Sequence, residues 1–129
     1  MNRLVMIEGI FSNNIYEASK KLLDVTSLRH DAIAANMANI ETPGYKRVDL
    51  PKNFSEQFAA SLRRGETAQM SVPSLALDTE AKTTRMDGNN VDMEKELISM
   101  SSNTMQYDAL TEFTSNSLKQ LRIAITGQV

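Results

Sequence analysis

Apolar residues recur at helical spacing over two long stretches, one near each end of the chain. In the first stretch, from Asn14 to Asn39, they follow steps of three and four residues, which places them on one face of a helix. A helix of this length spans about 35–40 Å, which is long for so small a protein. The apolar positions are Ile15, Ala18, Leu22, Val25, Leu28, Ala32 and Ala35.

The second stretch runs from Asp92 to Ile125. Asp92 or Asn90 can cap its first turn, because short polar side chains accept hydrogen bonds from free backbone N–H groups there. Glu94 and Glu96 place negative charge near the positive end of the helix dipole, so we interpret both carboxylates as solvated. The broad apolar face consists of Leu97, Met100, Tyr107, Leu110, Phe113, Leu118, Leu121 and Ile125.

The chain between these stretches is less regular. A short helix is predicted from Phe54 to Arg64, with Asn53 as its N-cap, Glu56 completing a capping box and Gly65 as its stop. Residues 66–86 are rich in Ser and Thr and contain a proline, which indicates loop with a small β-hairpin.

The predicted fold is mainly α, with two long terminal helices packed as an antiparallel coiled coil around a short irregular middle region. We divide the chain into 1–47, 48–90 and 91–129, and the two terminal parts form one discontinuous helical domain. A helix pair covers only part of each apolar stripe, so we expect neighbouring copies to cover the rest. The residues assigned to helix packing are Ile15, Leu22, Val25, Leu28, Leu97, Met100, Tyr107, Leu118, Leu121 and Ile125.

The first predicted helix stops abruptly. Residues that precede proline avoid the helical region, and Pro43-Gly44 is typical of the centre of a type II turn, with Gly44 at positive φ. An extended segment, 45–47, follows and is expected to contact the next subunit or layer. Asn36 and Asn39 lie in the Ala-rich end of the helix, where they either fix the register of packed helices or simply terminate the helix.

Composition narrows the function. The 129 residues are enough for one domain, and 41% of them are hydrophobic but only 5% aromatic, which suits helix–helix packing. The net charge is −2 without a basic stripe, which gives little support to nucleic-acid or anionic-lipid binding. Cysteine is absent, which excludes disulfides and thiolate metal sites. No apolar run reaches the length of a membrane span, and the first 15 residues lack the apolar core of a cleavable signal peptide.

Nothing in the sequence indicates catalysis. His30 is the single histidine and stands beside Asp31, without the convergent groups that metal and acid–base sites recruit. No phosphate-binding loop, nucleophile elbow or dinucleotide fingerprint occurs. We therefore expect a structural subunit that is not an enzyme and has no cofactor. A soluble helical adaptor or chaperone that binds a partner helix is the alternative.

The stretch from Ala35 to Lys46 resembles the N-terminal signature of bacterial flagellar axial proteins, A-N-x-A-N-x-x-T-P-G-Y-K/R. Segments 28–34, 86–92 and 103–125 resemble rod proteins of the proximal, FlgB type, and another short proximal-rod paralogue is the alternative. The matching signature positions are Ala35, Asn36, Ala38, Asn39, Thr42, Pro43, Gly44, Tyr45 and Lys46.

This resemblance implies a structural subunit of the proximal rod of the flagellar basal body. Such subunits pass through the flagellar type III export apparatus without a cleaved signal and polymerise in the periplasm. Their terminal helices line a hollow drive shaft that transmits torque and encloses the export channel. The implied partners are copies of the chain, other rod proteins, the rod-base adaptor protein and the membrane-supramembrane ring. Phe11 and Ile15 resemble an export element, although Phe11 packing on the first helix explains the pattern equally well.

Overall fold

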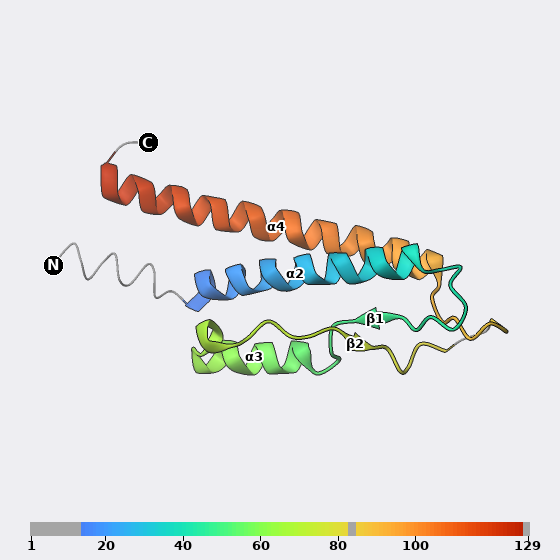
Figure 1. Cartoon of the computed structure of the whole chain (residues 1–129). Helices are drawn as coiled ribbons and strands as arrows, with labels where there is room; N and C mark the ends of the chain where they lie inside the picture. The colour runs from blue at the N-terminus through green and yellow to red at the C-terminus, as the bar shows by residue number, and fades with distance from the viewer. Residues whose placement is uncertain (1–13, 83–84, 128–129) are drawn as a thin grey trace.

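The computed structural model describes residues 14–82 and 85–127 and shows a mainly helical molecule in three layers (Figure 1). One long helix forms the middle layer, the second long helix lies on one side of it, and a short helix with two short strands lies on the other (Figure 1). In chain order the elements are α2 (Asn14–Ala38), β1 (Val48–Asp49), α3 (Phe54–Arg64), the 3-10 helix η1 (Thr67–Gln69), β2 (Ala76–Leu77) and α4 (Met93–Thr126).

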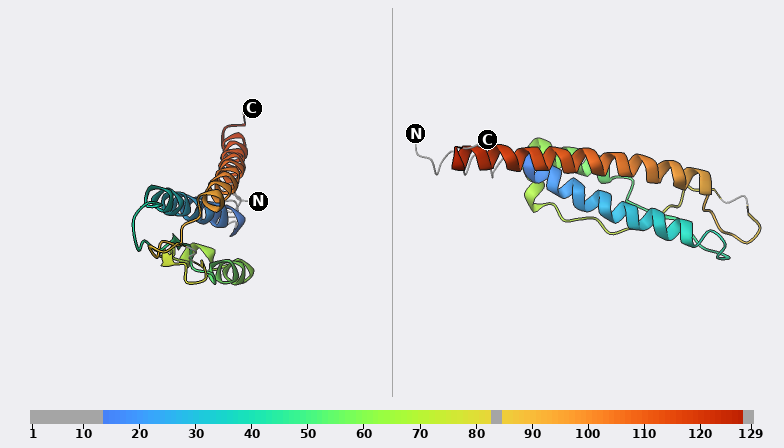
Figure 2. Two further views of the ribbon diagram at one scale, coloured as in Figure 1. Left: turned by 90° about the vertical axis from the view of Figure 1, so that its right-hand side faces the viewer. Right: turned by 90° about the horizontal axis from the view of Figure 1, so that it is seen from above.

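The two long helices pack against each other in antiparallel directions, as the sequence predicts (Figures 1 and 2). Their bounds lie within one residue of the predicted ones. At its C-terminal end α4 extends past the first turn of α2 (Figure 1). No helix in residues 14–82 and 85–127 combines the length and the apolar content that crossing a membrane requires.

Local signals fix the ends of the helices. The Asp92 carboxylate accepts hydrogen bonds from the backbone N–H groups of Glu94 (3.0 Å) and Lys95 (3.3 Å), which confirms Asp92 as the N-cap of α4. Gly65 ends α3 with φ at 71°, in the left-handed region that glycine adopts without strain.

The predicted capping box of α3 is wrong. Asn53 makes no side-chain capping hydrogen bond, because its own backbone is already helical, with φ at −78° and ψ at −1°. An N-cap side chain reaches the free N–H groups of the first turn from an extended backbone. The helix begins instead with a backbone hydrogen bond of 3.0 Å from the N–H of Phe54 to the carbonyl of Pro51.

The middle region contains the small antiparallel sheet that the sequence predicts, but its strands come from either side of α3. Val48 of β1 lies opposite Leu77 of β2, and Asp49 lies opposite Ala76. The connection between the strands holds α3 and η1, so the sheet is not a hairpin within residues 66–86.

The apolar stripe of α2 packs on α3. Ala18 and Val25 form a core cluster with Phe54 and Phe58, and the two phenylalanine rings lie 5.8 Å apart. Three partly buried apolar residues cover this cluster: Leu22, Leu50 and Met70. We expected the apolar stripe of α2 to pack against the second long helix. It packs instead against the layer that contains α3 and the two strands, which we call the short-helix layer.

Polar contacts line the packing between α2 and α4. The Asn103 amide donates to the carbonyl of Thr26 at 2.9 Å. The Thr114 hydroxyl donates to that of Ser19 at 3.4 Å. Ser19 and Thr26 lie seven residues apart, about two turns, on a narrow stripe beside the apolar one. Small side chains allow the two helices to approach closely.

Most large apolar side chains of α4 nevertheless remain uncovered. Their exposed fractions are 40–70%, for Leu97, Ile98, Met105, Tyr107, Phe113, Leu118, Ile123 and Ile125. Of the residues that we assigned to helix packing, Leu97, Tyr107, Leu118 and Ile125 are therefore not covered within a single copy, and neither is Ile15, which is 57% exposed. Leu121 and Val25 are buried, and Leu22, Leu28 and Met100 are half-buried.

Candidate assembly site

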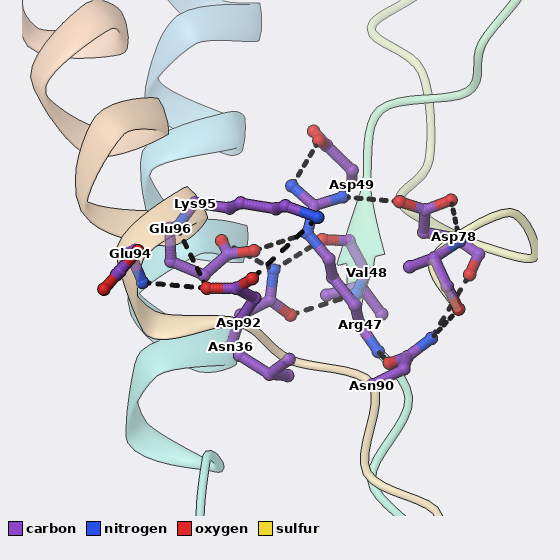
Figure 3. A network of polar contacts seen from close by, with 12 residues as sticks. Asn36, Arg47, Val48, Asp49, Asp78, Asn90, Asp92, Glu94, Lys95 and Glu96 are labelled. Atoms are coloured by element: carbon purple, nitrogen blue, oxygen red, sulfur yellow. Dashed lines mark hydrogen bonds and ion pairs between the residues drawn. The ribbon is translucent and has the colours of Figure 1, made fainter. Parts of the chain in front are cut away.

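The signature segment meets the start of α4 at one end of the helical pair. We call this region the signature junction and define it as residues 36–49 together with residues 85–96. The two segments are about fifty residues apart in the chain and are joined by hydrogen bonds and ion pairs, part of which Figure 3 shows.

The Pro43-Gly44 turn has the predicted form. The N–H of Tyr45 donates to the carbonyl of Thr42 at 3.2 Å, and Gly44 has φ at 72°. The N–H of Gly44 in turn donates to the carbonyl of Asp87 at 2.8 Å. The turn that takes the chain out of α2 is therefore tied to the turn that precedes α4.

Asn89 fastens the turn that follows α2. Its side chain is 1% exposed, and its amide nitrogen lies 2.9–3.0 Å from the carbonyl oxygens of Asn39, Ile40 and Thr42. These carbonyls belong to the turn, because α2 ends at Ala38. The Asn89 side-chain oxygen accepts from the N–H of Val91 at 2.8 Å, so one amide links the turn after α2 to the residues before α4.

Asn36 is fully buried and joins three parts of the chain. Its amide donates to the carbonyl of Val48 at 2.8 Å and to the carboxylate of Glu96 at 3.2 Å. Its oxygen accepts from the N–H of Val48 at 3.0 Å and from the Tyr45 hydroxyl at 3.2 Å. Asn36 thus bonds across the helices, whereas Asn39 donates to the carbonyl of Ala35 and belongs to the helix end.

Arg47 is the centre of a cluster of charges. Its guanidinium pairs with Asp78 at 2.8 Å and with Asp49 at 2.9 Å, and its Nε donates to the Glu96 carboxylate (Figure 3). Arg29 of α2 pairs with the other oxygen of Asp49 at 3.1 Å. The cluster therefore joins α2, β1, the segment after β2 and the first turn of α4.

The cluster shifts the pKa values of its members. Burial lowers the pKa of Arg47, but the hydrogen bonds and charges of Glu96 and Asp49 outweigh it, so that the pKa rises above its usual value. Burial raises the pKa of Asp49, yet the Leu50 N–H, the charge of Arg29 and the hydrogen bonds from Arg47 and Arg29 bring it below its usual value. Burial, with the Glu96 charge, raises the pKa of Tyr45.

One expectation fails at this junction. Glu96 is not solvated: it is fully buried, because Arg47 and Asn36 supply the charge and the hydrogen bond that a buried carboxylate requires. Polar groups of residues 45–47 bond within the chain, including the Lys46 ammonium, which donates to the carbonyl of Gly88. That this segment also contacts the next subunit or layer stays a prediction.

The remaining predicted positions differ in exposure. Ile15 lies in the first turn of α2, and Phe11 lies outside the described residues. Among the signature positions, Asn36 is buried; Ala35, Asn39 and Tyr45 are half-buried; and Ala38, Thr42, Pro43, Gly44 and Lys46 are exposed.

Sequence reasoning missed the roles of Asn89 and Glu96. Glu96 precedes the buried Asn103 by seven residues and Leu121 by twenty-five, about two and seven turns, so all three share one face of α4. A search for polar residues on that face would have found Glu96. Asn89 has no such signal, because its three carbonyl partners are set by the packing of two turns.

The junction is built to hold elements together. Every charged group of the Arg47 cluster has an opposite partner. The described residues contain no group of three or more His, Cys, Asp or Glu side chains that could hold a metal ion. The paired charges therefore hold α2, β1, the segment after β2 and the start of α4 together.

Comparison with known proteins gives the family. No family model matches the chain. The flagellar basal body rod protein FlgB of Borrelia hermsii is 32% identical over 133 residues, an alignment that covers 87% of this chain and 98% of that protein. The FlgB proteins of Buchnera aphidicola and Bacillus subtilis are each 27% identical, covering 89% and 92% of this chain and 96% and 98% of theirs. The chain, with its antiparallel terminal helices joined at the signature junction, therefore belongs to the FlgB family of flagellar basal body rod proteins.

Proposed function

We propose that this chain is a structural subunit of the proximal rod of the bacterial flagellum, and that it polymerises through its terminal helices into a hollow drive shaft. The observation that carries the proposal is the uncovered apolar surface of α4. Eight large apolar side chains of this one helix are 40–70% exposed. Apolar surface of this extent is typical of a face that another chain covers.

The signature junction supports the mechanical part of the proposal. A shaft that transmits torque needs subunits that do not yield between their elements. Asn36, Asn89 and Arg47 each connect segments that are distant in the chain, and all three are buried or nearly so. Packed and hydrogen-bonded elements resist sliding more strongly than a contact made by apolar side chains alone.

The proposal extends to assembly. The subunit reaches the periplasm through the flagellar type III export apparatus without a cleaved signal, and there encloses the export channel. Its partners are copies of itself, other rod proteins, the rod-base adaptor protein and the membrane-supramembrane ring. Residues 35–46 form the assembly signature, and Phe11 with Ile15 forms the export element. A free-standing helical adaptor accounts less well for the family membership.

Deleting the gene tests the proposal. We expect the deletion strain to lack rods and to be non-motile, and we expect the unsubstituted gene to restore both. Basal bodies isolated from the restored strain should contain the chain, as detected by mass spectrometry. A deletion strain that builds normal basal bodies and swims would contradict the proposal.

A further inference from the structure

A groove runs between α2 and α4 near the middle of α2. Ser27 and His30 of α2 and Asn103, Thr104 and Tyr107 of α4 line it. Its volume is about 180 Å³. A cavity of about 150 Å³ accommodates a benzene ring, so this groove has room for one long apolar side chain.

An unmet hydrogen-bond acceptor lies at the floor of this groove. Asn103 is 1% exposed, and its amide nitrogen is used by the carbonyl of Thr26. Its side-chain oxygen is buried and has no hydrogen-bond partner among the described residues. A buried acceptor without a donor destabilises the structure that contains it. The free subunit thus has an acceptor that an arriving N–H group can satisfy only after a neighbouring side chain has moved.

The opposite side of α4 carries a ridge. Ile98 and Met105 lie seven residues apart and are 70% and 69% exposed. Met105 follows Asn103 by two residues, which turns it about 200° around the helix axis, away from the groove. The side chains around this ridge are small or uncharged: Ser101, Ser102, Gln106 and Ala109.

We propose that the ridge of one copy docks into the groove of a second copy. Met105 enters between His30 and Tyr107, where its thioether gains a favourable contact with the Tyr107 ring. Gln106 follows Met105 and brings an amide that donates to the Asn103 oxygen once the exposed His30 ring has rotated aside. Rotamer changes of this kind are common when interfaces form. The inference rests on the proposed rod function and names the contact that builds the polymer.

Two observations favour a second copy as the occupant. First, ridge and groove lie at one level on opposite faces of the same helix. A ridge-to-groove contact leaves a free ridge on one copy and a free groove on the other, so it continues into a ring or an open helical polymer rather than stopping at a two-fold dimer. Second, neither the ridge nor the groove lining contains a Lys, Arg, Asp or Glu, so the two surfaces can meet without burying an unpaired charge of these residues.

Disulfide cross-linking tests the contact, since the chain contains no natural cysteine. His30→Cys and Met105→Cys are produced as separate chains in one deletion strain, so that a 30–105 disulfide can form only between copies. We expect mass spectrometry of oxidised basal bodies to detect this peptide pair. As a control, Met86→Cys replaces Met105→Cys, because Met86 is fully exposed on the turn before α4. Basal bodies that contain both variants but no 30–105 disulfide overturn the inference.

A charge substitution gives an independent readout. We expect Met105→Glu to lower incorporation into basal bodies at least about tenfold, since a carboxylate cannot enter an apolar groove without a partner. Met86→Glu, the same change at another exposed methionine, should incorporate normally. Equal incorporation of the two variants overturns the inference. If the proposed function itself is wrong, the result is different: the unsubstituted chain is then absent from basal bodies.

Discussion

At the residue scale, the chain depends on polar groups that are buried and paired. Glu96 and Asn36 are inaccessible to solvent and bond to each other. Arg47 pairs with Glu96 and with Asp49 of β1, and so connects them to the short-helix layer. A buried ion pair adds little stability compared with an apolar pair of the same size, but loss of one partner is costly because the other charge remains buried. These residues therefore specify how the layers fit together.

Replacing Arg47 should expose this dependence. We expect Arg47→Met to lower the free energy of unfolding by about 3–5 kcal/mol, because Glu96 is left without its cation. Urea denaturation of the purified subunit measures the change. Arg63→Met, at an exposed position of α3, is the control and should change it by less than about 0.5 kcal/mol. The double variant R47M/E96Q should recover part of the loss, and equal losses in the two single variants would contradict this account.

The low pKa of Asp49 predicts a loss of stability in acid. A carboxyl whose pKa is lower in the folded chain stabilises the fold above its unfolded value of about 4, and this contribution disappears as the pH falls through the folded value. We expect the free energy of unfolding to fall below about pH 4, and to fall less steeply in Asp49→Asn. Chemical denaturation between pH 2 and about pH 7 measures both slopes. Parallel curves for the two proteins would show that Asp49 contributes nothing to this dependence.

At the scale of elements, one side chain connects the regions where the two long helices end and begin. The Asn89 amide donates to carbonyls of the turn after α2, while its oxygen accepts from Val91, the residue before the N-cap Asp92. The end of one long helix and the beginning of the other are thus held at a fixed distance. Since the helices are antiparallel, this distance sets which residues of α2 lie opposite which residues of α4.

Loss of the Asn89 amide should weaken this link. We expect Asn89→Ala to lower the free energy of unfolding by about 1–3 kcal/mol, because three carbonyls each lose one of their two donors and the buried Asn89 side chain is removed. Amide hydrogen exchange should then increase in residues 36–45 more than in α3. Asn116→Ala, at an exposed position of α4, is the matched control. If Asn89→Ala and Asn116→Ala have the same stability, Asn89 does not hold the helix ends.

At the scale of the whole molecule, the two sides of α2 differ in how they are packed. The short-helix layer covers the apolar stripe of α2, small polar residues hold α4 in place, and the far side of α4 stays uncovered. The folded chain therefore has its core on one side of α2 and its free apolar surface on the other side of the pair. This distribution suits a subunit that is completed by its neighbours.

The end of α4 offers a test of that division. We expect the double variant I123E/I125E to keep the free energy of unfolding within about 0.5–1 kcal/mol of the parent chain, because both side chains are exposed. Its incorporation into basal bodies should nevertheless be lost, which quantitative mass spectrometry can measure. Asn116→Glu adds charge to the same helix and should incorporate normally. A double variant that assembles as well as this control would show that the end of α4 is not an assembly surface.

The sequence alone determined the features that depend on neighbouring residues. Helical periodicity predicted both long helices to within a residue, and local chemistry predicted a cap at Asp92 or Asn90, the positive φ of Gly44 and the helix stop at Gly65. These features follow from backbone sterics and hydrogen bonds over a few residues, which every short segment carries in itself.

Only the tertiary structure decided which faces meet. Periodicity shows that a helix has an apolar stripe, but not which partner covers it, and here α3 takes the stripe of α2 while polar residues face α4. Glu96 was misjudged for the same reason, since its burial requires Arg47, forty-nine residues earlier. Contacts between distant segments depend on the joint geometry of all the elements, and no single segment contains that information.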